Sequence, residues 1–340
     1  MPGFNQHIKQ LLILSMLIAL ILLSIVELRI FLPGLLGALT LYILSRGSYF
    51  QLVYHRKWKK GWTAGLFLIG YILMICLLIY VIVILLGPKI QQFLDDPAMM
   101  IGAAKKTLAE LQLKTGYTFI TENELSAFLH RLSGYLPKLI NDTMDLILNL
   151  VIMLFFLYYM LVHGKEMEQY IGRIIPLKQS NIDILASETK RIVKASALGI
   201  PLISIIQGLA ATLGYFMFGI DDFVLWGFIT GVFAFFPVIG TMLIWVPLVL
   251  SVYAGGDTWN ATWLFFYSAI VTGNVDYLAR ITLLKRMGNI HPVITVLGVL
   301  VGLGLFGFIG LIFGPLLINY IVLLFRIYSN EFIENNPDSD

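Results

Sequence analysis

The sequence predicts an all-α, polytopic integral membrane protein with about eight to ten membrane-embedded helices. Of its 340 residues, 59% are hydrophobic and only 13% are charged, and the mean hydropathy is +0.86. A soluble domain carries roughly 25% charged residues. Many stretches run for about 18 residues or more without a charge, which is long enough to cross a hydrocarbon core of about 30 Å. A soluble globular fold is therefore excluded.

Ten apolar segments are expected to lie in the membrane. They cover residues 8–26, 30–45, 62–86, 142–163, 196–218, 222–236, 238–254, 260–278, 292–306 and 308–327. The first could pass for a signal peptide, but no small-residue cleavage site follows it, so we interpret it as a retained span. Glu27 and Arg29 are expected to mark a short external turn after it. The segments 222–236 and 292–306 are short for full crossings, and either could be half of a re-entrant hairpin.

The chain is expected to divide into five regions. These are N-terminal spans (1–86), a helical extracytoplasmic insert (87–141), a span with a cytoplasmic amphipathic helix (142–195), a transport region rich in Gly and Pro (196–328) and a polar tail (329–340). Thr121 and Glu124 form a capping-box pattern, and leucines follow at helical spacing, which predicts helix in the insert. The apolar stripe of the insert could pack on its own protomer and the membrane surface, or contact a neighbouring subunit.

Three residues are expected to set the ends of the helices in region 142–195. Gly164 is expected to end the span at 142–163. Ser180, with Asp183 three residues later, resembles the N-cap of a new amphipathic helix that runs into the span at 196–218.

The distribution of Lys and Arg predicts the orientation of the chain. Basic residues gather in three loops, 46–61, 164–195 and 279–291. The turns at 219–222 and 255–257 carry aspartate and no basic residue. Because short cytoplasmic loops are enriched in Lys and Arg, the basic loops and the N-terminus are expected in the cytoplasm. The C-terminus is inside if 292–327 crosses twice and outside if 292–306 is only half of a hairpin.

Two apolar segments are interrupted by Gly and Pro at membrane depth. The first contains Phe236, Pro237 and Gly240, and the second runs from Pro292 to Pro315 with glycines at 298, 302, 304, 307, 310 and 314. Paired, interrupted apolar segments point to the substrate site of a transporter. The pathway residues expected from them are Phe236, Pro237, Gly240, Pro292, Gly302, Gly307, Gly310, Gly314 and Pro315. Alternatively, Pro237 lies in an ordinary turn and the glycines are close helix-packing contacts.

A polar group lies between these two segments. Asp276 and Arg280 are four residues apart, so they share a helical face and can pair. An intramembrane charge is a candidate functional group, but at the cytoplasmic end of a span this pair would be an interfacial salt bridge. Asn274, one turn earlier, could bind substrate or a neighbouring helix. His291 could titrate near neutral pH or be a plain interfacial residue.

The remaining residues give few further signals. Ser204 and Gln207 are isolated polar groups in the span 196–218, which interhelical hydrogen bonds explain as well as substrate contact does. The sequence contains no metalloprotease, nucleophile-elbow or Walker motif, so no enzyme and no cofactor are expected. The net charge of +3 comes from residues between spans and does not indicate nucleic-acid binding. The single cysteine, Cys76, is expected to be a packing residue.

Three motifs in the C-terminal half resemble the signature of the AI-2E family, the autoinducer-2 exporter-like permeases of bacteria. They are Phe236-Pro237-Val238-Ile239-Gly240, then Asn274-Val275-Asp276-Tyr277, and then His291-Pro292-Val293 followed by Leu305-Phe306-Gly307-Phe308-Ile309-Gly310-Leu311-Ile312-Phe313-Gly314-Pro315. The order of early spans, polar insert and punctuated C-terminal half is similar along nearly the whole chain. This chain has Ile281 where the family often has a proline.

The resemblance implies a multi-pass transporter of the bacterial inner membrane that exports a small polar organic molecule similar to autoinducer-2. It also implies homo-oligomers, with the pentamer as one form, and contact with membrane lipid. We expect alternating access in which the C-terminal half moves against the early spans. One alternative is a sodium (or lithium)/proton antiporter with Asp276 as the shared carboxylate and a coupling proton or sodium ion. The other is a non-transporting membrane scaffold that acts through the insert.

Overall fold

A computed structural model describes residues 2–95, 143–236, 239–275, 292–307 and 310–329, with positions 102, 105–110, 112, 113, 124 and 127 between the first two ranges. Within these residues, every regular element is a helix. Five helical segments are long and apolar enough to cross a membrane, and shorter apolar helices accompany them. The predicted all-α polytopic membrane fold is therefore confirmed.

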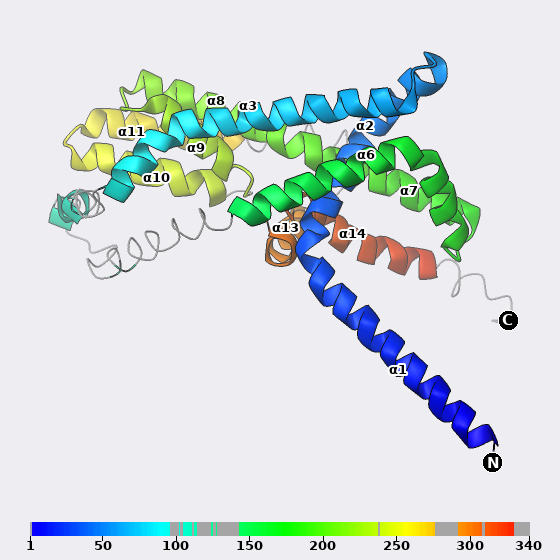
Figure 1. Cartoon of the computed structure of the whole chain (residues 1–340). Helices are drawn as coiled ribbons and strands as arrows, with labels where there is room; N and C mark the ends of the chain where they lie inside the picture. Colours follow the sequence, from blue (N-terminus) through cyan, green and yellow to red (C-terminus); the bar gives the residue numbers. More distant parts are fainter. Residues whose placement is uncertain are drawn as a thin grey trace, which may run out of the picture.

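The N-terminal region is one continuous helical run that bends once. Helix α1 (Pro2–Leu28) passes through a 3-10 turn, η1 (Arg29–Phe31), into α2 (Leu32–Phe50) and a π-helical turn, η2 (Gln51–His55). Pro33 lies in the first turn of α2, where a missing N–H costs nothing, so the helix restarts at once. Where an external turn was predicted at Glu27 and Arg29, the chain bends through η1 without forming a loop (Figure 1), and the side on which it lies stays a prediction.

Helix α3 (Lys60–Asp95) is longer than the predicted span at 62–86. Its 36 residues extend about 54 Å at 1.5 Å per residue, so it reaches beyond a hydrocarbon core of about 30 Å. It runs along most of the length of the body, past α8 and α9 (Figure 1). The described positions of the insert that follows, including 105–110, are helical, whereas Thr121 lies outside the described residues.

Helices α6 (Thr143–Ile174) and α7 (Gln179–Lys194) correct two predicted helix ends. Helix α6 continues ten residues past Gly164, because that glycine faces the ring of Tyr42, and a Cβ there would lie 2.9 Å from the ring carbon Cζ. The glycine therefore permits a close approach and does not end the helix. Helix α7 begins at Gln179, and its N-cap is Lys178, not Ser180. As predicted, α7 continues through the π-helical turn η3 (Ala195–Gly199) into the next span.

The C-terminal half combines one long helix with short ones. Helix α8 (Ile200–Met217) is followed by α9 (Phe223–Phe233), α10 (Ile239–Ala254), α11 (Thr258–Tyr267) and the π-helical turn η4 (Ser268–Thr272). Helices α13 (Pro292–Phe306) and α14 (Gly310–Tyr328) end the described chain. Helices α9, α10 and α13 have 11, 16 and 15 residues, or about 16–24 Å, so each is too short for a full crossing.

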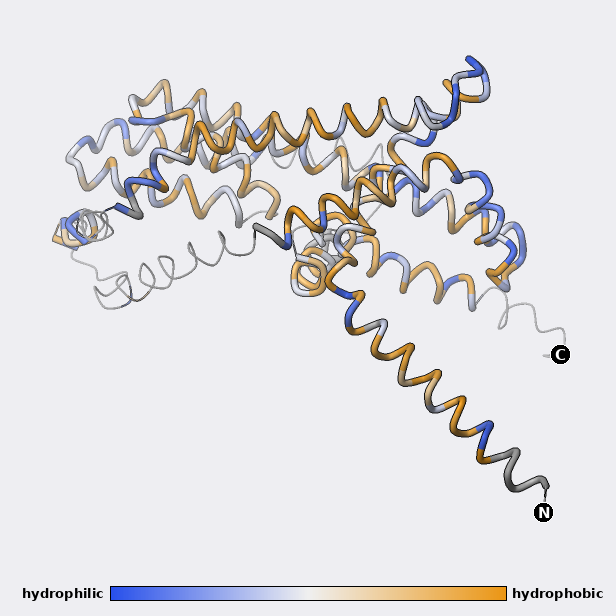
Figure 2. The backbone as a smooth tube through the Cα atoms, viewed as in Figure 1, coloured by the Kyte–Doolittle hydropathy of each residue, from blue (hydrophilic) through white to orange (hydrophobic). Residues whose placement is uncertain are grey.

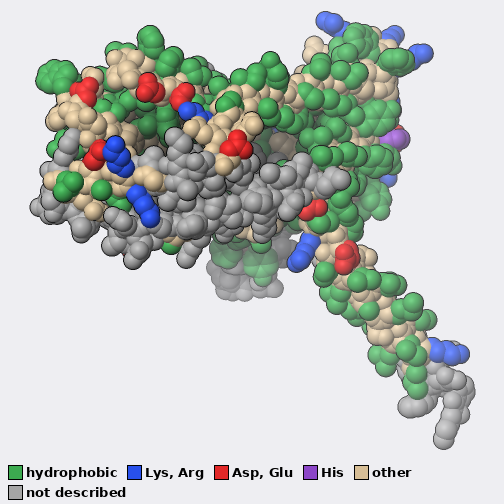
Figure 3. Space-filling model, turned by 60° about the vertical axis from the view of Figure 1, so that its left-hand side comes forward, with side chains coloured by type: hydrophobic (Ala, Val, Ile, Leu, Met, Phe, Trp, Pro, Cys, Tyr) green, Lys and Arg blue, Asp and Glu red, His purple; other side chains and the backbone are tan. Residues whose placement is uncertain are grey.

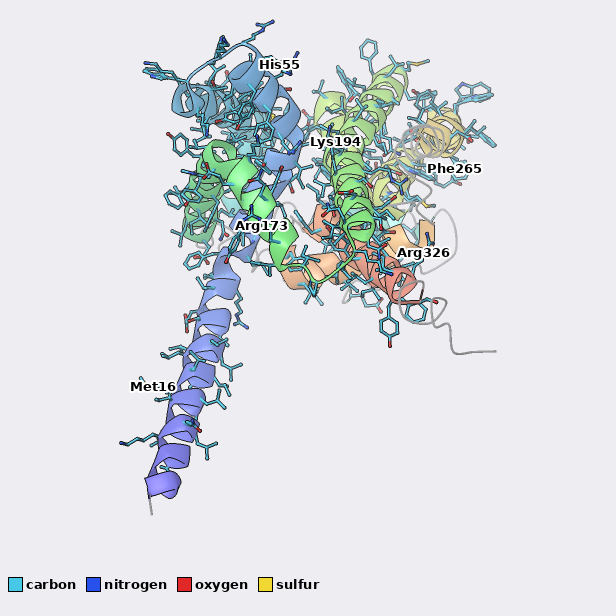
Figure 4. The ribbon with its side chains drawn as sticks, turned by 90° about the vertical axis from the view of Figure 1, so that its right-hand side faces the viewer. Met16, His55, Arg173, Lys194, Phe265 and Arg326 are labelled. Atoms are coloured by element: carbon cyan, nitrogen blue, oxygen red, sulfur yellow. The ribbon has the colours of Figure 1, made fainter. Side chains whose placement is uncertain are left out.

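The helices form two packed groups, which Figure 4 separates clearly. The first group joins α2, α3 and α6 around a core that includes Tyr42, Tyr49 and Leu157. The second joins α8, α9, α10 and α11 around a core that includes Tyr215 and Trp245. Helix α14 packs on α7 and α2 through a third core, which includes Ile192 and Phe313.

The two ends of the molecule separate the basic loops from the acidic turns, as predicted from the sequence. Figure 2 shows polar segments at both ends of the long axis and apolar helices between them. The η2–α3 junction and the α6–α7 turn, both basic, lie at one end, and the α8–α9 and α10–α11 turns lie at the other (Figure 1). Helix α14 ends at the basic end. Apolar side chains cover the flanks and most of α1, as lipid contact requires (Figure 3).

A charged cluster fixes α2 to α6 at the basic end. The Arg46 guanidinium donates to both carboxylate oxygens of Glu168, with Nη2 2.6 Å from Oε2. The Tyr42 hydroxyl donates to the same carboxylate over 2.7 Å. A bidentate Arg–carboxylate pair is directional as well as strong, so this cluster sets the relative position of the two helices.

We expect Glu168→Gln to lower the melting temperature of the purified protein by a few degrees. The amide cannot accept two charged hydrogen bonds from Arg46 as the carboxylate does, so α2 is held less firmly on α6. The control is Glu166→Gln on the same helix, where the side chain is 69% exposed and pairs with His163 one turn away. Equal melting temperatures for the two variants would show that the Glu168 cluster does not stabilise the fold.

Candidate functional site

Glycines hold helices α13 and α14 together as a tight hairpin. Gly298 and Gly302 lie one turn apart on α13, and Gly310 and Gly314 lie one turn apart on α14. A Cβ built on Gly302 would lie 2.6 Å from the Cα of Gly314 and collide with the carbonyl oxygen of Gly310. The two backbones are therefore in direct contact, as in other small-residue helix pairs.

The other punctuating residues of this segment have separate tasks. Gly307 makes the turn between the helices with φ +60, a conformation that favours glycine. Gly304 faces open space, because no atom lies within 4 Å of the point that a Cβ would occupy. Pro315 lies inside α14, fully buried, with its Cα 2.5 Å from a Cβ on Gly298. Pro292 begins α13, where its fixed φ suits the first turn.

The break at Phe236 forms a second hairpin, between α9 and α10. Helix α9 ends at Phe233, and the carbonyl oxygen of Phe236 accepts from the N–H of Gly240 over 3.2 Å. A Cβ on Gly240 would collide with the Phe233 carbonyl oxygen, so the start of α10 touches the end of α9. The Phe236 ring packs on Phe233 and is partly exposed. Pro237 lies outside the described residues.

A third glycine contact, which was not predicted from the sequence, joins α8 to α9. A Cβ on Gly208 would lie 3.2 Å from the carbonyl oxygen of Gly227 and 3.3 Å from the Cα of Gly231. A Cβ on Gly231 would lie 2.8 Å from the carbonyl oxygen of Ser204. The sequence contains a pattern that could have predicted this contact, because residues 227–231 have the Gly-x-x-x-Gly spacing that 298–302 and 310–314 also have.

Of the polar group at 274–280, only Asn274 lies within the described residues. Its side chain is exposed, and Nδ2 donates to the carbonyl oxygen of Ile270 over 2.6 Å, in the π-helical turn η4. Asn274 thus bonds to its own helix and not to a neighbouring one. Asp276, Arg280 and His291 lie outside the described residues, so their pairing stays a prediction.

The interior of the second helix group contains buried polar side chains. Thr230 on α9 is fully buried, bonds to the Tyr215 hydroxyl over 3.0 Å and donates to the carbonyl oxygen of Trp226 over 2.8 Å. Gln207 on α8 is also fully buried, but neither its amide nitrogen nor its amide oxygen has a hydrogen-bond partner. The interhelical hydrogen bonds considered for Ser204 and Gln207 are absent from the described part of the chain.

The arrangement is thus two glycine-packed helical hairpins, α9–α10 and α13–α14. The turn of α9–α10 and the turn of α13–α14 both lie inside the body, away from the polar ends (Figure 1). The described residues include no group of three or more His, Cys, Asp or Glu side chains that could hold a metal ion. Over residues 12–330, the chain matches the sequence profile of the AI-2E family transporter. The chain belongs to the AI-2E transporter family.

Curated relatives in this family are distant in sequence. A protein of Helicobacter pylori strain J99 is 24% identical over 219 residues, which cover 62% of this chain and 62% of that protein. One of Aquifex aeolicus is 22% identical over 213 residues (63% and 60%), and one of Treponema pallidum is 22% identical over 289 residues (80% and 71%). All three are named "Putative transport protein". The chain spans about three fifths of the length of the first two.

We expect Gly302→Ala to destabilise the protein by about 1–3 kcal/mol, because an added methyl group must separate two touching backbones. Gly304→Ala, two residues away on the same helix, has room for its methyl group and should leave stability unchanged or slightly raised, since alanine favours helix. Thermal unfolding of both variants in detergent measures the difference. If Gly302→Ala has the same melting temperature as the wild type, this backbone contact does not stabilise the packing of α13 on α14.

Proposed function

We propose that this protein is a multi-pass transporter of the bacterial inner membrane that exports a small polar organic molecule, similar to autoinducer-2, by alternating access. The observation that carries the proposal is the pair of glycine-packed helical hairpins with their turns inside the body. Discontinuous helices near the bilayer midplane are typical of secondary-transporter substrate sites. Family membership supports transport in general and leaves the substrate open.

The hairpin turns can supply the polar contacts that a substrate needs. At membrane depth, backbone N–H and C=O groups freed at a helix end are tolerated only where protein covers them or a water-filled cavity meets them. The turn residues Phe236, Pro237, Gly307 and the start of α14 would therefore border the pathway. Gly302, Gly310 and Gly314 would contribute to the pathway indirectly, because their backbone contacts hold the α13–α14 hairpin rigid.

The two helix groups suggest which parts move. The group α2–α3–α6 is clamped by the Arg46–Glu168 pair, which suits a static frame. The group α8–α11 has its own core and meets the far end of α3 through an ion pair between Lys89 and Asp222, 2.6 Å apart, in which both side chains are nearly half exposed. Exposed ion pairs contribute little free energy, so this contact can break and reform during a transport cycle.

The proposed orientation follows the positive-inside rule. We place the end that carries the basic η2–α3 and α6–α7 connections, together with the end of α14, in the cytoplasm. Residue 1 is then cytoplasmic as well if α1 and α2 cross the membrane in opposite directions at the η1 bend. A coupling proton or sodium ion, lipid contacts and assembly into homo-oligomers, with the pentamer as one form, complete the proposal.

Uptake of a panel of small solutes into proteoliposomes, with and without imposed proton and sodium gradients, tests the function. We expect saturable flux of at least one uncharged polar solute, with empty liposomes as the control. Salt-driven proton movement that disappears in Asp276→Asn would instead identify the antiporter. Absence of any flux from well-folded protein would favour the non-transporting scaffold.

A carbodiimide can test the motion with native residues, since it joins the Lys89 amine to the Asp222 carboxylate without a spacer. We expect coupling to reduce flux by at least the fraction of molecules that mass spectrometry shows to be coupled, because α9 can then no longer move relative to α3. The control, Lys89→Gln, lacks the amine and should keep its flux after the same treatment. Full flux through fully coupled protein would contradict movement between these two helices.

A further inference from the structure

Within the described part of the chain, four buried polar atoms of the second helix group have no hydrogen-bond partner. They are the amide oxygen and amide nitrogen of Gln207 and the hydroxyl oxygens of Ser204 and Ser268. Gln207 has 0% exposure, and Ser204 and Ser268 are buried as well. Buried polar side chains in native proteins are almost always bonded, so each exception requires an explanation.

The same helix group satisfies a comparable hydroxyl group nearby. Thr230 is as deeply buried as Gln207, yet it bonds to both Tyr215 and the carbonyl oxygen of Trp226. Leaving an amide unbonded in the interior costs free energy that an apolar side chain of the same shape would avoid. The Gln207 amide is therefore not accounted for by the packing of this conformation.

The unbonded atoms lie where α8 meets two other elements. Ser204 and Gln207 are three residues apart and share one face of α8. The carbonyl oxygen of Ser204 meets Gly231 of α9. The Tyr267 hydroxyl donates to the carbonyl oxygen of Ala210 over 2.9 Å, which brings the next residue, Ser268, to α8 as the first residue of the π-helical turn η4. Such π-helical turns occur often at functional sites.

We propose that Ser204, Gln207 and Ser268 form a binding site for an uncharged, hydroxyl-bearing small solute. The two hydroxyl groups and the amide offer both donors and acceptors, which a polyol or sugar-like molecule can match. A bare cation would coordinate the oxygens and leave the Gln207 nitrogen unpaired. Among the described residues, none that is buried carries a charge, so the site fits a neutral ligand better than an ion.

The site is closed in this structure, and the glycine contact between α8 and α9 explains how it opens. At Gly208 and Gly231 the two helices meet through backbone, and at Gly227 the small Thr212 side chain fills the space; the Tyr215–Thr230 hydrogen bond is the polar link across the contact. Separation of α9 from α8 would expose Ser204 and Gln207 without unlocking large side chains at these three positions. This inference rests on the proposed transport function, because a solute reaches the site only in a conformation in which α8 and α9 have parted.

The first test is the sign of a change in melting temperature. Gln207→Leu removes the unbonded amide and keeps a similar volume, so the purified protein should melt a few degrees higher than the wild type. The matched control, Thr230→Val, removes a bonded hydroxyl from the same helix group and should melt lower. A Gln207→Leu variant that melts below the wild type would mean that the amide is bonded, and the proposal would fail.

The second test uses erythritol and ribose as probes at millimolar concentrations, too low for general osmolyte effects. We expect one of them to raise the melting temperature of the wild type and to enter proteoliposomes saturably. In Gln207→Leu the affinity behind both effects should fall at least about tenfold, which corresponds to about 1.4 kcal/mol of binding free energy. Replacing sodium chloride by choline chloride should change neither effect. A rise in melting temperature that requires sodium and disappears in Gln207→Leu would show that the site binds a cation, and the proposal of a neutral ligand would fail.

Two results separate this inference from the transport function itself. If a panel solute is transported equally by the wild type and by Gln207→Leu, the transport function is supported and the proposed binding site is refuted. Absence of all flux from folded wild-type protein would refute the transport function, and with it the role of Gln207 in transport, whatever the melting temperatures show.

Discussion

The fold depends on one constraint: a backbone that leaves the helical conformation inside a bilayer must be covered by protein. Lipid offers no hydrogen bonds, so an exposed helix end at membrane depth is costly. Here the helices too short to cross are paired with a neighbour, and glycines allow the backbones to touch at Gly302–Gly310 and at Gly208–Gly227. Direct backbone contact is what lets helices α9 and α13 end inside the body.

The same contacts divide the molecule into rigid and separable parts. The α13–α14 hairpin is closed by backbone contacts along two helical turns and is tied to α7 through a shared apolar core. The α2–α6 pair is closed by a bidentate ion pair. The α8–α9 glycine contact is different, because α8 also carries the Ser204 hydroxyl and the Gln207 amide, which have no hydrogen-bond partner in the described part of the chain. Rigid elements and one unsatisfied contact surface are compatible with a protein that changes shape around a solute.

Sequence patterns predicted the positions of the breaks because Gly, Pro and segment length act locally. They placed the break at Phe236 and the short segments 222–236 and 292–306 correctly. They failed where a residue's role depends on a distant partner. Gly164 is predicted to stop a helix until Tyr42 of another helix is seen against it, and only the structure separates the glycines that touch the opposite backbone, at 298, 302, 310 and 314, from Gly304 and Gly307, which do not. No sequence pattern could reveal that the Gln207 amide has no partner.

The short helices also have a consequence for how the protein is made. The runs Ile8–His55 and Lys60–Gln92 are long and apolar enough to enter the bilayer as soon as they leave the ribosome. Helices α9 and α13 are not: α9 packs against α8 and α10, and α13 against α14, so each is fully covered only when the next helix along the chain has been synthesised. Biogenesis is therefore expected to run in two stages, with the early spans inserted first and each hairpin entering afterwards as a finished pair.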